Sequence, residues 1–334
     1  MNLTSSLSIL GKYLDQPRLV RTFSRAVPAI AVTGGTLCAL NNVSKSPKGK
    51  KRKEFIKNVA VLTGALGSAL FAPKIASKIL KEHSHESKII SSEAIDEFLH
   101  NNLVTERTRN FLNLAKKNFL KFSKVKAIVE ELETKENGRN FLNELIPNPE
   151  NINSKEIFSE IKKLSIMGII PVLGGIAGGV VGDKLTEKNW KEKIPDKIKE
   201  GTYQFLANIF LCNVGAGAAL WGMEKAKIQS KSARAIGMIG GIILAGIVFG
   251  SAVANLVGKI CVDPLLKHKD KKYVHRHVDL YSERRPELLD ISLHVDDIAT
   301  VAVLSGLKWI EPALPILYSI SGYRAGIGYR NGKH

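Results

Sequence analysis

The feature of this sequence that most limits its fold is the uncharged segment from Leu164 to Gly182, LSIMGIIPVLGGIAGGVVG. Its length is close to the roughly 20 apolar residues that a helix needs to cross a bilayer. Glycines recur at helical spacing, so one face carries almost no side chain and a second backbone can approach closely. The segment predicts a membrane-spanning helix with a packing face of the glycine-zipper type, made by Gly174, Gly175, Gly178, Gly179 and Gly182.

Apolar residues elsewhere are also segregated into blocks, although 44% hydrophobic and 24% charged residues would by themselves suit a soluble protein. With the segment above, the blocks are 26–43, 55–72, 164–182, 205–223, 235–258 and 298–323. The fifth block repeats the small-residue spacing with Gly237, Gly241, Gly246, Gly250 and Gly258. We predict an all-α, multi-pass membrane protein with about six short transmembrane helices in two or three glycine-rich hairpins.

Between the second and third blocks, residues 73–163 are polar with amphipathic helical periodicity, which predicts a soluble or membrane-surface insert. We expect helices to begin at Ser92 and Ser154, and one longer helix to carry the apolar positions from Phe111 to Leu132. The predicted organisation is a basic segment 1–25, a hairpin 26–72, the insert 73–163, a hairpin 164–223, a membrane pair 235–323 with polar linker 263–297, and a tail 324–334.

An internal repeat would explain why the blocks resemble one another. Residues 55–59 align with 205–209 at an offset of 150 that also superposes Gly67 on Gly217, and residues 59–64 match 301–306. We interpret these matches as two or three related hairpins. The alternative is that glycine-rich apolar helices are alike in composition alone.

The net charge of +18 belongs to the segments between the blocks. Lysines and arginines flank apolar residues without interleaved aromatic residues, so the pattern indicates anionic lipid headgroups and excludes a nucleic-acid partner. With the amino terminus outside, twenty basic residues lie in inside loops against eleven outside, the long insert left out. We predict a multi-pass protein of a bacterial cytoplasmic membrane, with an organellar inner membrane as the alternative, and a second copy or another membrane protein as partner.

Four polar residues inside apolar blocks are candidates for a transport pathway. Lys308 and Glu311 are three residues apart, next to a helix break expected at Pro312, and Asn208 and Asn213 lie in the fourth block. An unpaired charge costs at least about 2.5 kcal/mol on insertion scales, so such residues are often functional. The alternative is structural: charges at headgroup level, and asparagines that hydrogen-bond between helices.

The polar linker contains histidine and carboxylate side chains that suit a divalent metal ion: His275, His277, His294 and Asp297. A metal there would activate water against a lipid phosphate. The alternative is a solvated loop, and no other cofactor is expected. Cys38, Cys212 and Cys261 have no CxxC partner, so we expect free thiols.

No catalytic residue can be assigned from these patterns. The strongest signals concern helix packing and lipid surfaces, which favours a membrane scaffold or assembly protein without enzymatic activity. A small-solute or ion transporter is the first alternative, and a metal-dependent membrane enzyme acting on lipid phosphate is the second.

Overall fold

The computed structural model describes residues 10, 13–14, 16–80, 92–101, 104–134, 154–228, 231–264, 284, 301 and 308–328. These residues are almost entirely helical, and no strand occurs among them. The predicted all-α class is therefore confirmed for the described part of the chain.

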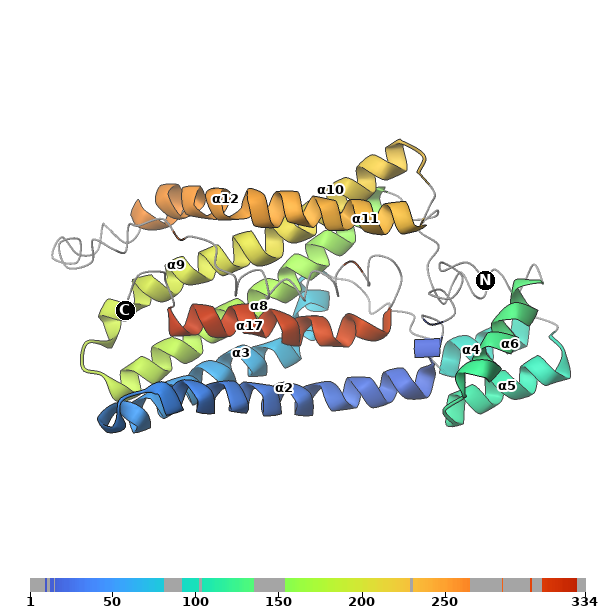
Figure 1. Cartoon of the computed structure of the whole chain (residues 1–334), viewed down its shortest axis with the longest axis horizontal. Helices are drawn as coiled ribbons and strands as arrows, with labels where there is room; N and C mark the ends of the chain where they lie inside the picture. The colour runs from blue at the N-terminus through green and yellow to red at the C-terminus, as the bar shows by residue number, and fades with distance from the viewer. Residues whose placement is uncertain are drawn as a thin grey trace.

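Most helices lie roughly along one axis (Figure 1). They are α2 (Pro17–Lys45), α3 (Lys51–Leu80), α8 (Ser154–Thr186), α9 (Ile194–Phe205), α10 (Leu211–Lys225), α11 (Lys231–Ile242), α12 (Gly250–Val257) and α17 (Leu314–Ile327). The short 3-10 segments are η1 (Lys48–Lys50), η3 (Trp190–Lys193) and η8 (Lys308–Ala313). The π-helical turns are η4 (Leu206–Phe210), η5 (Ile243–Val248) and η6 (Gly258–Val262).

Five helical stretches of the described chain are long and apolar enough to cross a membrane: Pro17–Lys45, Lys48–Leu80, Ile161–Thr186, Trp190–Lys225 and Ile236–Val262. The end of the predicted sixth block differs from these. It consists of η8, which contains Pro312, followed by the 14 residues of α17. At about 1.5 Å per residue, a helix of that length is shorter than the hydrocarbon core of a bilayer.

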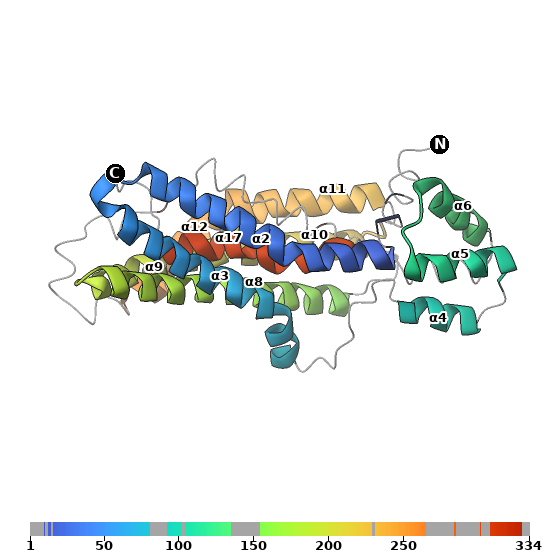
Figure 2. The ribbon, with the colours of Figure 1, turned by 90° about the horizontal axis from the view of Figure 1, so that it is seen from below.

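The helix α17 is instead part of the core of the bundle, where it contacts α3, α8 and α9. Figures 1 and 2 both show it lying among the longer helices. Leu314, Tyr318 and Ala325 are fully buried and belong to the same apolar cluster as Leu164 and Met167 of α8. The last described helix thus completes a core that begins with much earlier parts of the chain.

Glycines of α8 lie directly against the backbones of two neighbours. A Cβ atom at Gly178 would meet the Ala60 carbonyl of α3 and lie 3.1 Å from the Val61 Cα atom. A Cβ atom at Gly175 would meet the backbone of Gly322 in α17. Side chains are therefore excluded from both contacts.

Three shorter helices form a separate group beyond the start of α2 (Figure 2), and we call this group the head: α4 (Ser92–Asn101), α5 (Glu106–Lys117) and α6 (Phe122–Glu133). Its apolar residues, including Ile95, Leu112, Val129 and Leu132, form a core of their own. The side chain of Gln16 connects the head to α2, because it donates to the Leu120 carbonyl at 3.2 Å and accepts from the Leu120 amide at 2.9 Å.

The single helix predicted from Phe111 to Leu132 is wrong. The backbone is extended at Asn118 and Lys121, which separates α5 from α6. Both helices place apolar residues in the same core, so the spacing of those residues continues across the break.

Other predicted boundaries are close to the observed ones. Helices α4 and α8 begin at Ser92 and Ser154 as expected. Helix α2 already begins at Pro17, and α3 continues past Pro73 to Leu80, so both are longer than the apolar blocks they contain.

Candidate functional site

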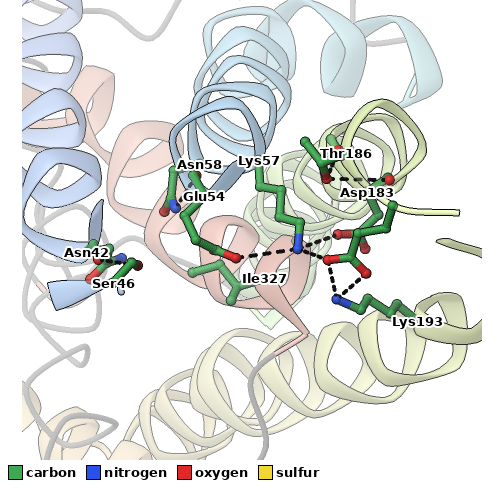
Figure 3. Close-up of polar contacts among 12 residues, drawn as sticks. Asn42, Ser46, Glu54, Lys57, Asn58, Asp183, Thr186, Lys193 and Ile327 are labelled. Atoms are coloured by element: carbon green, nitrogen blue, oxygen red, sulfur yellow. Dashed lines mark hydrogen bonds and ion pairs between the residues drawn. The ribbon is translucent and has the colours of Figure 1, made fainter. Parts of the chain in front are cut away.

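One end of the bundle brings together the α2–α3 connection, the α8–α9 connection and the last turn of α17 (Figures 1 and 3). We call it the basic end, because residues 45–53 and 184–199 are both rich in lysine. At its centre, Lys57 of α3 forms ion pairs with Glu187, with Asp183 at 3.7 Å and with Glu54 at 3.5 Å. Figure 3 shows Glu54 and Asp183 on either side of the Lys57 ammonium group.

Two lysines of the next segment complete this network. The Lys197 ammonium lies 3.0 Å from Asp183 Oδ2 and donates to the Gly326 carbonyl of α17 at 2.6 Å. Lys193 donates to Glu187 Oε1 at 2.7 Å. Asp183 and Lys197 are each only 3% exposed, so this pair is desolvated and fixes the junction of α8, α9 and α17.

The ionisation of Glu187 is changed by this environment. Burial by itself raises the pKa of the carboxyl, but hydrogen bonds from Lys193 and Lys57 outweigh burial and hold the pKa below its ordinary value. Glu187 is therefore charged at neutral pH.

A second polar contact joins three helices close to this network. The Tyr323 hydroxyl of α17 donates to Asn58 Oδ1 of α3, and Asn42 Nδ2 of α2 donates to the same hydroxyl at 2.7 Å. Asn58 Nδ2 donates to the Glu54 carbonyl at 2.7 Å. Asn58 and Tyr323, which are buried, thus have hydrogen-bond partners, as polar groups in a lipid environment require.

Buried polar side chains also follow one face of the stretch formed by α9, η4 and α10. Gln204 donates to Glu200 at 2.8 Å, and Asn208 donates to Gln204 at 2.8 Å. The π-helical turn η4 adds a residue to the helix, so Asn213, five positions after Asn208, returns to this face. All four side chains are buried, and we call them the polar stripe.

The guanidinium group of Arg284 lies at the start of the polar stripe. It forms a fully buried ion pair with Glu200, with Nε 3.2 Å from Oε2, and stacks 4.6 Å from the centre of the Tyr203 ring. The backbone of Arg284 accepts from Asn255 Nδ2 at 2.9 Å. These contacts tie α9 to α12.

The charges predicted in the sixth block have a different arrangement. The carboxylate of Glu311 accepts from Lys163 of α8 at 3.1 Å. Lys308 is the first residue of η8, and its side chain lies outside the described residues. A further ion pair joins Lys199 to Asp263 at 2.5 Å.

The remaining predicted residues divide into two groups. Gly241 faces Gly215, Gly246 faces Cys212, and Gly250 lies near Ala207, whereas a Cβ atom at Gly258 would have no described atom within 4 Å. The predicted metal ligands His275, His277, His294 and Asp297 lie outside the described residues. No group of three or more metal-ligating side chains occurs within the described ranges.

An open cavity of about 960 Å³ lies beside the ion-pair network. Its lining residues are Lys53 from the start of α3, Lys184, Leu185 and Thr186 from the last turn of α8, and Glu187, Lys188, Asn189 and Trp190 from the α8–α9 connection. The ammonium groups of Lys184 and Lys191 lie 5.9 and 5.7 Å from the centre of the Trp190 ring. An aromatic ring and several cations therefore line one surface, which suits an anionic group with an apolar portion.

The ion-pair network was not expected from the sequence. Apart from Lys57, its residues lie in the basic segments between the apolar blocks, whose charges the sequence pattern assigned to lipid headgroups. The available signal was spacing, since Asp183 and Glu187 are four residues apart, as are Lys193 and Lys197. Such pairs share a helix face, but the sequence does not say which faces meet.

No protein-family model, curated protein or solved structure matches this chain.

Proposed function

We propose that the protein is an integral membrane scaffold whose glycine-packed helices hold the head at one membrane face. The observation that carries the proposal is the contact of α8 with the backbones of both α3 and α17. Contacts between backbones have no side-chain rotamers to rearrange, and close van der Waals packing is a main source of helix association in lipid. Such a rigid set of helices is suited to holding the head in a fixed position.

The attachment of the head supports a positioning role. Gln16 is buried and bonded to Leu120, and the Arg18 side chain donates to the Lys117 carbonyl at 2.8 Å. Leu114, Phe119 and Phe122 remain exposed on the head. We assign this surface to a protein partner, either a second copy of the chain or another membrane protein.

The orientation follows from charge. The basic end faces the cytoplasm of a bacterium, or the matrix side of an organellar inner membrane in the alternative location, because Lys and Arg are retained on that side. The head, at the opposite end of α2, then faces outward.

The test places a photo-activated crosslinker at Leu114 and irradiates membranes of cells that produce the full chain natively. A scaffold gives a discrete covalent adduct with one protein, and the adduct is lost in a Gly178→Leu variant that still inserts into the membrane. The matched control places the crosslinker at exposed Lys227 of the α10–α11 connection. Equal adducts from both positions, or none from Leu114, would contradict a role for the head.

Ion or small-solute transport is the second candidate, and the polar stripe is the observation that favours it. Buried polar residues along a membrane-spanning stretch often mark pathways. Purified protein in sealed vesicles provides the test, with wild type beside Glu200→Gln, Asn213→Leu and Glu311→Ala. Flux above that of protein-free vesicles that falls in these variants would replace the scaffold proposal. Flux equal to empty vesicles removes transport.

A further inference from the structure

We propose that the cavity lined by Lys53, Lys184, Lys188 and Trp190 binds the phosphate headgroup of an anionic phospholipid. The inference rests on the proposed membrane location and adds a defined site and ligand class to it. Most of the basic residues of this chain would attract anionic lipid only diffusely, whereas this cavity gathers three of them around one volume.

The charge of the cavity is strongly positive because Glu187, the only carboxylate among its described lining residues, is already paired. Glu187 accepts hydrogen bonds from Lys57 and Lys193, which belong to the ion-pair network and are not among the lining residues of the cavity. Within the described parts of the chain, Lys53, Lys184 and Lys188 have no carboxylate at ion-pair distance, and all three side chains are exposed. Three ammonium groups therefore remain to donate to phosphate oxygens.

The apolar part of the ligand is indicated by the neighbouring side chains. Leu185 lines the cavity and is 68% exposed, and Val181, one turn earlier on α8, is also exposed. On α3, Phe55 and Val59 are exposed within two turns of Lys53. A headgroup in the cavity would thus have its acyl chains beside an apolar helix surface.

Trp190 places the cavity at the depth of the headgroups. Tryptophan prefers the membrane–water interface, and this one is the first residue of the candidate span 190–225, four positions after the end of the span 161–186. A soluble phosphate compound would use the lysines but would have no use for the exposed Leu185 and Val181 surface. The combination favours a lipid over a free anion.

The experiment uses Trp190 as the reporter. The chain has three tryptophans, so Trp221→Phe and Trp309→Phe leave Trp190 alone. The full-length protein is reconstituted in phosphatidylcholine vesicles that contain brominated phosphatidylglycerol or brominated phosphatidylcholine, and quenching of Trp190 is titrated. We expect brominated phosphatidylglycerol to quench at about tenfold lower content than brominated phosphatidylcholine.

Two triple variants separate a site from diffuse attraction. Lys53→Gln with Lys184→Gln and Lys188→Gln should abolish the preference for phosphatidylglycerol. Lys45→Gln with Lys48→Gln and Lys50→Gln makes the same charge change at the same end without touching the cavity, and it should keep the preference. Equal losses in both variants would overturn the proposal, because they indicate diffuse electrostatics.

Two further measurements identify the ligand source and check the membrane location. Inorganic phosphate, added at constant ionic strength, should not reverse the quenching by brominated phosphatidylglycerol, and full reversal would assign the cavity to a soluble phosphate instead. A variant that keeps only Trp221 reports insertion independently of the cavity. Quenching of Trp221 without any lipid preference at Trp190 refutes the site alone, whereas no quenching of either residue refutes the membrane location.

Discussion

Asp183 is the residue on which the basic end depends most. It is buried beside two lysines, Lys57 and Lys197, which come from different helices. Removing one member of a buried pair leaves a desolvated charge, which commonly costs about 3–5 kcal/mol, although replacing the entire pair by apolar residues is often neutral. We therefore expect Asp183→Asn to destabilise the junction of α8, α9 and α17, because it would leave the buried Lys197 ammonium without its carboxylate partner.

Glu187 gives this network a pH dependence. Its pKa is held below the ordinary value of 4.5, so its contribution to stability is complete above that value and is lost as the pH falls through the lowered pKa. We expect Glu187→Gln to reduce the stability of the detergent-solubilised protein at about pH 6 by a few tenths to about 1 kcal/mol, because the side chain is partly exposed.

Thermal unfolding between about pH 6 and about pH 3 checks this expectation. The difference between wild type and Glu187→Gln should shrink as the pH falls. Glu106→Gln, at an exposed carboxylate of α5 outside the network, is the control for the loss of one negative charge. A constant difference for Glu187→Gln would mean that its ion pairs do not contribute to folding.

At the scale of the element, local sequence signals predicted where helices begin but did not predict where helices are interrupted. Ser92 and Ser154 mark real helix starts, and Pro312 lies in a 3-10 segment before α17. The break between α5 and α6 was missed because Asn118 is held by tertiary contacts, including the Arg18 side chain at 3.4 Å. The π-helical turns also have no clear sequence signal, since each adds one residue to an otherwise regular apolar helix.

Glycine-to-alanine substitutions should have different effects on the free energy of unfolding at two helix positions. Gly178→Ala puts a Cβ atom against the Ala60 carbonyl, and we expect a loss of about 1–3 kcal/mol from displaced backbones. Gly240→Ala, in α11, meets no described atom within 4 Å, so the better helix propensity of alanine should leave stability unchanged or raised by up to about 1 kcal/mol.

Unfolding by a denaturing detergent, titrated against a mild one, measures both variants in the same assay. Equal effects of the two substitutions would show that propensity alone decides the result, and that the α3–α8 contact is looser than described.

At the scale of the whole molecule, the two basic connections lie at one end and the head lies at the other (Figures 1 and 2). The alternation of apolar and basic segments predicted that residues 45–57 and 184–199 lie on the same side. The position of α17 could not be anticipated, because apolar composition does not distinguish a short buried helix from the end of a spanning one.

Cysteine labelling in intact cells tests the arrangement. In a background with Cys38, Cys212 and Cys261 replaced by alanine, we expect Lys48→Cys and Lys188→Cys to be protected together from a membrane-impermeant thiol reagent. Lys227→Cys at the opposite end should be labelled. Protection of Lys48→Cys with labelling of Lys188→Cys would place the two connections on opposite sides and contradict the bundle.

The central position of α17 also has a consequence for how the molecule is made. Its glycines Gly322 and Gly326 fill the contact with Gly175 and Gly179, yet they are synthesised more than 140 residues later. Earlier helices can enter the membrane as they leave the ribosome, but the interior of the bundle remains open until α17 arrives. A ribosome that stalls before residue 314 would therefore release a product with unprotected glycine faces, which membrane quality-control proteases could recognise.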